Sequence, residues 1–188
     1  LSSWLVRLAW ENGRKLHPFS VKGLGLPRNF WYADIDRSVH PEELANIAEV
    51  TGTDPARVKA TTLVSCLKTI LADDSVESRG PTPWVLPIAP RARRWHRPGM
   101  QLCPECLATD EIPYFRKQWR LSFVAACPVH GSLMLDRCHR CARPINFHRG
   151  DYCLQTPPEE FPWVFCPECG ADWRIAPRDT ATSDSLDL

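Results

Sequence analysis

Four short pairs of cysteine and histidine residues decide how the second half of this chain is built. They are Cys103-Pro104-Glu105-Cys106, Cys127-Pro128-Val129-His130, Cys138-His139-Arg140-Cys141 and Cys166-Pro167-Glu168-Cys169. A gap of two residues lets both side chains of a pair reach one metal ion, with sulfur–zinc distances of about 2.3 Å. The pairs supply eight ligands, which is the number that two tetrahedral zinc ions need. The sequence therefore predicts a metal-built module between residues 103 and 169.

The order of the pairs leaves two ways of sharing two ions. In sequential pairing the first two pairs hold one ion and the last two hold the other. In a cross-braced arrangement the first pair joins the third and the second joins the fourth, and such folds keep the middle pairs very close in sequence. Seven residues separate His130 from Cys138. This separation favours sequential pairing, with ligand sets Cys103, Cys106, Cys127, His130 and Cys138, Cys141, Cys166, Cys169.

We expect both ions to be structural Zn²⁺. A catalytic zinc usually has three protein ligands and keeps one position open for water, whereas four protein ligands saturate the ion. Zinc binding by small finger peptides contributes about 10–16 kcal/mol, and this is folding free energy for such modules. The sequence contains no GxxxxGK[ST], GxSxG or HExxH motif, so no familiar phosphate-binding or hydrolytic site is indicated. The sequence predicts a protein that is not an enzyme.

Composition and charge describe a globular chain with a basic middle. The chain has 188 residues, of which 44% are hydrophobic and 24% charged, values typical of a folded protein. Its formal net charge is +1, but residues 91–149 carry eleven basic and four acidic side chains, and residues 150–188 carry two and eight. A polyanion would therefore meet the middle of the chain.

Cysteine usage indicates metal binding in a reducing compartment. Seven of the nine cysteines lie in the ligand pairs, a spacing unlike that of secreted disulfide proteins. Of the other two, Cys66 is expected in the core and Cys153 is expected to be a spare thiol. No apolar run long enough to span a membrane and no signal peptide are visible. We expect a cytoplasmic protein.

Residues 1–72 are expected to form a helical domain that contains a helix-turn-helix. Pro41 can begin one helix, Thr51-Gly52 can end it, and Asp54-Pro55 can begin a second. The second helix is expected to run to Leu71. Its basic residues Arg57 and Lys59 are candidates for DNA contact. A solvated face of a small helical domain explains them equally well, because any helical hairpin shows this pattern.

The expected fold class is α plus small zinc-ribbon or zinc-finger modules. A linker rich in proline and arginine (73–100) follows the helical domain, then a first zinc finger (101–135), a second (136–177) and an acidic tail (178–188). In the linker Arg91, Arg93, Arg94 and Arg97 flank Trp95, which suits phosphate contact or an exposed connector.

Further basic and aromatic side chains lie within, between and just after the ligand pairs. Arg116, Lys117, Arg120 and Arg140 are hypothesised to contact the DNA backbone or an acidic partner, and the alternative is a solvated basic face. The aromatic residues either pack around the metals or anchor a partner; they are Tyr114, Phe115, Trp119, Trp163, Phe165 and Trp173.

Several stretches are similar to one known family. The opening Leu1–Ala9 with Asn12-Gly13, and the segments 102–107, 113–121, 127–133 and 138–141, resemble the TniQ/TnsD family of transposon target-selection proteins. The resemblance extends from residue 1 to about residue 175, and the zinc segment is its most specific part. The predicted helix-turn-helix also lies where this family places one.

The resemblance implies a non-catalytic adaptor in transposition, in a bacterial protein associated with the nucleoid. Members connect a target-site recogniser to an AAA+ transposition regulator (TnsC-like) on double-stranded DNA. In some systems the recogniser is a CRISPR effector with its guide RNA, and longer TnsD-like members read an attachment site directly. The residues alone leave an alternative open: a stand-alone zinc-finger and helix-turn-helix regulator that binds a specific DNA sequence.

Overall fold

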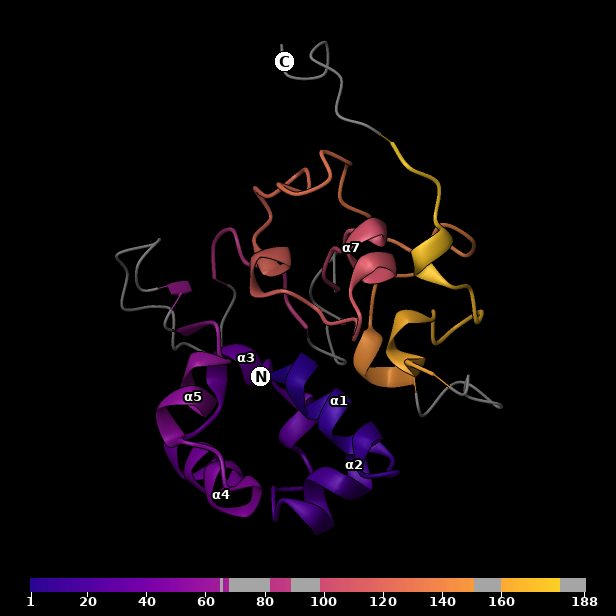
Figure 1. Cartoon of the computed structure of the whole chain (residues 1–188). Coiled ribbons are helices and arrows are strands. Elements are labelled where there is room, and N and C mark those ends of the chain that lie inside the picture. The colour runs from indigo at the N-terminus through magenta and orange to yellow at the C-terminus, as the bar shows by residue number, and fades with distance from the viewer. Residues whose placement is uncertain (65, 68–81, 89–98, 151–159, 180–188) are drawn as a thin grey trace.

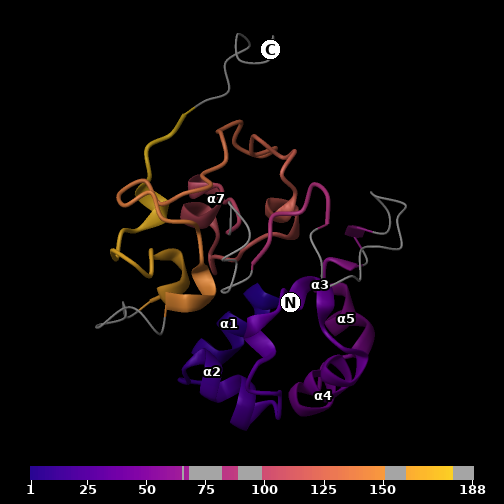
Figure 2. The ribbon, with the colours of Figure 1, turned by 180° about the vertical axis from the view of Figure 1, so that it is seen from behind.

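Two halves, one helical and one built of turns, meet at the N-terminus of the chain. The computed structural model describes residues 1–64, 66–67, 82–88, 99–150 and 160–179. In Figure 1 the indigo-to-magenta helices lie on one side and the orange-to-yellow segments on the other, and the view from behind in Figure 2 shows the same division. No helix of the described part is long and apolar enough to span a membrane.

The helical half is a set of short helices around one apolar cluster. Its elements are α1 (Ser2–Glu11), α2 (Leu16–Pro18), the π-helical turn η1 (Phe19–Gly23), the 3-10 turn η2 (Phe30–Tyr32), α3 (Ile35–Ser38), α4 (Pro41–Thr51) and α5 (Pro55–Ala60). Leu5 and Ala9, one turn apart on α1, are buried with Ile47 of α4 and Val58 of α5. This spacing is the apolar stripe that a surface helix turns toward a core.

The boundaries of α4 and α5 follow the expected signals. Pro41 begins α4, and the Glu43 carboxylate accepts a hydrogen bond from the His40 backbone N–H at 2.8 Å. Gly52 ends the helix with a left-handed φ of 63°, which glycine adopts at little cost. The Asp54 side chain then caps α5 by accepting from the Ala56 N–H at 2.6 Å.

The second helix of the hairpin is shorter than the sequence pattern indicated. It ends at Ala60, and the chain then turns so that the Leu63 N–H donates to the Asp36 carbonyl at 2.7 Å. Leu63 and Leu67 belong to a separate small cluster with Val85 and Leu121. The fold therefore contains two short helices around a glycine turn, and their use in reading DNA stays a prediction.

The second half is held by turns and a shared aromatic core. It contains α7 (Pro104–Thr109) and the 3-10 turns η4 (Lys117–Arg120), η5 (Phe147–Arg149), η6 (Pro162–Val164) and η7 (Trp173–Ile175). Over residues 99–150 and 160–179 the extended pairings are isolated bridges, such as Leu102 with Leu135, and no sheet forms. The fold class is thus mostly helical, with two cysteine-rich modules.

The two predicted fingers share one hydrophobic core. Phe115, from the first, stacks on Phe147, from the second, with ring centroids 4.1 Å apart. Phe115 also meets Trp173 edge-on at 6.2 Å. Trp119, Trp163 and Trp173 are fully buried in the same cluster as five of the paired cysteines. These aromatic residues therefore pack around the cysteine clusters, while Tyr114 stays 39% exposed and Phe165 half-buried.

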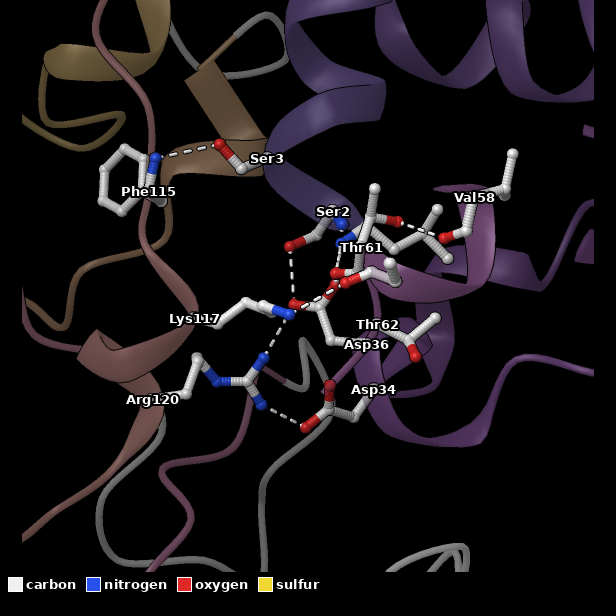
Figure 3. Close-up of polar contacts among 12 residues, drawn as sticks. Ser2, Ser3, Asp34, Asp36, Val58, Thr61, Thr62, Phe115, Lys117 and Arg120 are labelled. Carbon is white, nitrogen blue, oxygen red and sulfur yellow. Dashed lines mark hydrogen bonds and ion pairs between the residues drawn. The ribbon is translucent and has the colours of Figure 1, made fainter. Parts of the chain in front are cut away.

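A buried ionic cluster joins the two halves. Arg120 of η4 is 1% exposed and donates to Asp36 at 2.8 Å, to the Leu86 carbonyl at 2.7 Å and to Asp34. Ser2 donates to Asp36 from its backbone N–H at 2.6 Å and from its hydroxyl at 2.7 Å. Figure 3 shows the Arg120 guanidinium between the two carboxylates.

The ionic cluster keeps Asp36 charged although it is buried. Burial by itself raises the pKa of this carboxyl, but the α-amino group of Leu1, the Arg120 guanidinium and the Ser2 donors outweigh burial and hold the pKa well below its usual range. Two further contacts close the seam: Phe115 N–H donates to Ser3 Oγ at 2.9 Å, and Lys117 Nζ donates to the Ala60 carbonyl at 2.8 Å.

A buried histidine makes the same seam sensitive to acid. His148 is 5% exposed, stacks on Trp31 of the helical half at 5.8 Å, and neither ring nitrogen has a hydrogen-bond partner. Burial, followed by the charge of Arg149, lowers the pKa of His148 to about 4. Because the unfolded chain takes up this proton near its ordinary value of about 6.5, folding loses stability as pH falls from about 6.5 toward 4.

Replacing His148 with phenylalanine is expected to flatten the pH dependence of stability. Between pH 7 and pH 5 the native protein should lose about 2 kcal/mol more than the His148→Phe variant, which keeps an aromatic ring against Trp31 but binds no proton. Denaturant unfolding at both pH values measures the difference, and any protonation of the cysteine clusters is common to both proteins. If the stabilities of the two proteins changed equally with pH, the assignment of this acid sensitivity to His148 would be contradicted.

Candidate metal centres

The first cluster brings one histidine nitrogen against three sulfur atoms. His130 Nδ1 lies 3.5 Å from Cys103 Sγ, 3.4 Å from Cys106 Sγ and 3.6 Å from Cys127 Sγ. Cys106 Sγ and Cys127 Sγ are 3.6 Å apart, and all four ligand atoms lie within 4.8 Å of one another. The three cysteines are buried and His130 is half-buried.

The distances in the first cluster are those of a tetrahedral zinc shell. Ligand bonds of about 2.3 Å for sulfur and about 2.0–2.1 Å for nitrogen place two sulfurs about 3.8 Å apart, and a sulfur and a nitrogen about 3.5 Å apart. The observed separations of 3.4–3.6 Å agree with these values. The first cluster can therefore hold a metal ion, and its donor set fits zinc.

The second cluster has the same size with four sulfur ligands. Cys138 Sγ lies 3.7 Å from Cys169 Sγ, and Cys141 Sγ lies 3.7 Å from Cys166 Sγ. All four sulfur atoms lie within 4.8 Å of one another. The structure thus groups the pairs sequentially, the first with the second and the third with the fourth. Neither shell leaves a ligand position free for water or substrate, because each already has four protein donors.

Three of the four pairs use one backbone turn. The residue after the second ligand donates its N–H to the carbonyl of the first ligand: Gly131 to Cys127 at 2.8 Å, Gly170 to Cys166 at 2.8 Å and Ala142 to Cys138 at 2.9 Å. These residues have left-handed φ angles of 66°, 70° and 56°. The first pair differs, because Cys103 caps α7 by accepting from the Cys106 N–H at 3.4 Å.

The left-handed turn residues are expected to differ in their tolerance of substitution. Gly131→Ala should lower stability by about 1–2 kcal/mol, because a Cβ at this position meets no atom within 4 Å and only the backbone conformation is penalised. Ala142→Gly is the matched control at the equivalent position, and it should raise stability or leave it unchanged. Thermal unfolding of the two zinc-loaded variants measures both stability changes. Equal losses of stability in the two variants would contradict the expected difference.

Backbone N–H groups lower the pKa of one thiol in each cluster. Burial raises the pKa of the Cys127 thiol, but N–H groups of His130 and Val129 outweigh it and lower the pKa to about 7. At Cys138 burial is likewise outweighed by N–H groups of Cys141 and Arg140, and the pKa is again about 7. Metals bind thiolates, so each cluster has one ligand that is substantially ionised near neutral pH.

Comparison with protein families decides what kind of protein carries these clusters. A family model described as TniQ matches residues 1–134, which is well over half of the chain. The chain belongs to the TniQ family. Comparison with curated proteins finds no significant match. The family match contains the helical half and the whole first cluster and ends before the second cluster, short of the span over which the resemblance was expected.

TniQ-family membership makes this a transposition-associated protein. Of the basic residues predicted to contact DNA or a partner, Arg57, Lys59, Lys117 and Arg140 are exposed. Lys117 reaches the carbonyl of Ala60, at the end of the helix that carries Arg57 and Lys59. The structure thus places Lys117 at the C-terminal end of the helix that carries Arg57 and Lys59. Arg91, Arg93, Arg94 and Arg97, like Cys153 and residues 180–188, lie outside the described residues.

Arg116 and Arg120 hold this TniQ-family chain together internally. Arg120 is buried between Asp34 and Asp36, so its guanidinium is closed to a phosphate and it no longer belongs to the proposed contact surface. Arg116 is 18% exposed, forms a bidentate pair with Asp110 at 2.8 and 3.0 Å, and lies 4.4 Å from the Tyr114 ring.

Sequence reasoning missed the acidic partners of Arg120 and one neighbour of the first cluster. Asp34 and Asp36 carry no motif, and their arginine lies more than eighty residues away in the sequence. Ser132 is 2% exposed with its hydroxyl 3.6 Å from Cys103 Sγ. A signal for Ser132 existed, because the residue follows the Cys-x-x-His-Gly turn directly and faces the same centre.

Proposed function

We propose that this TniQ-family chain is a non-catalytic adaptor in DNA transposition, built on two structural zinc ions. It links a target-site recogniser to the AAA+ transposition regulator on double-stranded DNA. The match to the TniQ model over residues 1–134 carries this proposal. Two saturated four-ligand clusters support a scaffolding role for the metal, because neither keeps a position for substrate. A recogniser of the CRISPR type, with a guide RNA, is one of the partners that such an adaptor serves.

The adaptor role has a direct test with purified components. The zinc-loaded chain should co-purify with an AAA+ transposition regulator assembled with nucleotide on duplex DNA. When the regulator is omitted, the strong retention of the chain on the DNA should be lost. Weak, salt-sensitive binding to duplex DNA alone is expected, because adaptor contacts to phosphate carry little sequence information. An absence of regulator association would overturn the proposal.

A stand-alone DNA-binding regulator is the second candidate. The observation that favours it is the α4–α5 hairpin with exposed Arg57 and Lys59 on its second helix. Such a protein binds one short duplex at about 10⁻⁸ M or tighter without partners, and far more tightly than unrelated DNA. Selection from a random duplex library separates the candidates, because only the regulator enriches a single sequence.

Charge reversal on α5 is expected to weaken DNA association. The double variant Arg57→Glu with Lys59→Glu should reduce affinity for duplex DNA by at least about tenfold at low salt and should lower the dependence on salt concentration. Arg28→Glu with Lys22→Glu is the matched control, because these residues are also exposed but lie on a different part of the helical half. Equal affinities of native protein and α5 variant would remove α5 from the DNA surface.

A further inference from the structure

An open cleft lies at the seam between the two halves, and none of the eight metal-ligand residues lines it. It has a volume of about 520 Å³ and is lined from the helical half by Trp4, Arg7 and Thr61 and from the first finger by Tyr114, Arg116 and Lys117. Two neighbouring contacts hold its two walls together, from the Phe115 N–H to Ser3 and from Lys117 to the Ala60 carbonyl. Figure 3 shows Phe115 on Ser3 and the Lys117 side chain. A ligand in this cleft therefore touches both halves at once.

All the charged side chains that line the cleft are positive. Three cationic side chains line it, and its lining contains no carboxylate. Asp110 neutralises Arg116 through two hydrogen bonds. The side chain of Arg7 makes no hydrogen bond or ion pair within the described part of the chain, and its Nε is buried. Lys117 uses only one donor, on the Ala60 carbonyl. Arg7 and Lys117 thus have donors available for an anion.

The remaining walls of the cleft are aromatic. Trp4 is half-buried and Tyr114 is 39% exposed. The Arg116 guanidinium lies 4.4 Å from the centre of the Tyr114 ring, and Arg7 lies 5.9 Å from it. Because guanidinium groups already cover this ring, it offers no free platform on which a nucleotide base could stack. The cleft therefore suits an anion that carries an apolar side chain better than it suits a single-stranded nucleic acid.

We propose that this cleft binds an acidic peptide segment of a protein partner, with a carboxylate on Arg7 and Lys117 and an adjacent apolar side chain against Trp4. The proposal rests on the proposed adaptor role, because an adaptor needs a surface for a protein partner. Burial of a charged pair with its hydrogen bonds gives such a contact its strength. Occupation of the cleft stabilises the arrangement of the two halves, because the ligand contacts both.

The test is a binding titration with the purified, zinc-loaded chain. The probe is a short labelled peptide that alternates glutamate with leucine and phenylalanine, compared with the same peptide carrying glutamine in place of glutamate, and with oligothymidine of equal length. The glutamate peptide should bind at least about tenfold more tightly than the glutamine peptide. It should shift the backbone amide resonances of residues 114–118.

Substitutions of cleft residues test whether the peptide binds in the cleft. Arg7→Gln and, independently, Lys117→Gln should each weaken peptide binding by about tenfold, while Arg28→Gln, an exposed arginine outside the cleft, should change it less than twofold. Equal binding of the two peptides, or unchanged binding in both cleft variants, would overturn the proposal. Stronger binding of oligothymidine with shifts at the same residues would also overturn it and assign the cleft to nucleic acid.

The peptide test and the test of the adaptor role fail separately. The titration contains no transposition component, so peptide binding through Arg7 with no association to an AAA+ regulator removes the adaptor role alone. Regulator association that survives Arg7→Gln, together with no peptide binding, removes the cleft proposal alone.

Discussion

Replacing Cys166 with serine is expected to unfold the whole second half of the chain, including the first finger. Cys166 is fully buried and supplies one of the four sulfurs of the second cluster. Structural zinc contributes about 10–16 kcal/mol in small finger modules, which exceeds the total stability of many domains. The described part of this half has no sheet, and its longest helix, α7, has six residues, so little else holds it.

Loss of the second cluster should also unfold the region around the first, because the two clusters share one hydrophobic core. Phe115 packs between Phe147 and Trp173, so loss of the second cluster removes its neighbours. Near-ultraviolet circular dichroism and tryptophan fluorescence report this loss, since Trp119, Trp163 and Trp173 are all buried there. Cys66→Ser is the matched control, because Cys66 lies outside both clusters. A Cys166→Ser protein with an unchanged aromatic spectrum would contradict the shared-core account.

Replacing Arg120 with methionine is expected to cost about 3–5 kcal/mol of folding stability. The substitution leaves Asp34 and Asp36 in the seam without their guanidinium partner, and breaking one side of a buried ion pair carries a penalty of this size. Arg140→Met removes an exposed arginine and should change stability by less than about 0.5 kcal/mol. Denaturant unfolding of the zinc-loaded proteins measures both.

A double substitution separates lost charge pairing from lost packing. Adding Asp36→Asn to Arg120→Met removes one buried charge, so the double variant should be less destabilised than the two single variants summed. Additive losses would show that Arg120 and Asp36 do not act as a pair. A charge reversal at Arg120 is consequently a test of folding and not of DNA contact.

The metal ligands could be predicted from the sequence because their chemistry is local. A Cys-x-x-Cys or Cys-x-x-His turn determines its own ligand geometry, and the seven residues between His130 and Cys138, too many for a cross-brace, indicated which pairs combine. The caps of α4 and α5 were predictable for the same reason, since Pro41, Gly52 and Asp54 act within one turn.

The parts that escaped prediction depend on contacts between distant segments. Arg120 lies among basic residues between two ligand pairs and so resembles a surface residue, yet its partners are on the other half of the molecule. Beyond the end of α5 at Ala60, the Leu63 N–H donates to the Asp36 carbonyl, a contact that no local pattern encodes. The fingers were expected as tandem modules, whereas the stacking of Phe115 on Phe147 merges their cores.

The metal content of the intact chain tests the central claim most directly. Native mass spectrometry and elemental analysis should find two zinc ions per chain. Cys106→Ser should remove the ion of the first cluster, and Cys169→Ser, at a half-buried ligand, the ion of the second. Chelation of both ions should abolish the aromatic circular dichroism of the buried tryptophans. A metal-free chain with that signal intact would contradict the view that metal ions hold this half of the molecule together.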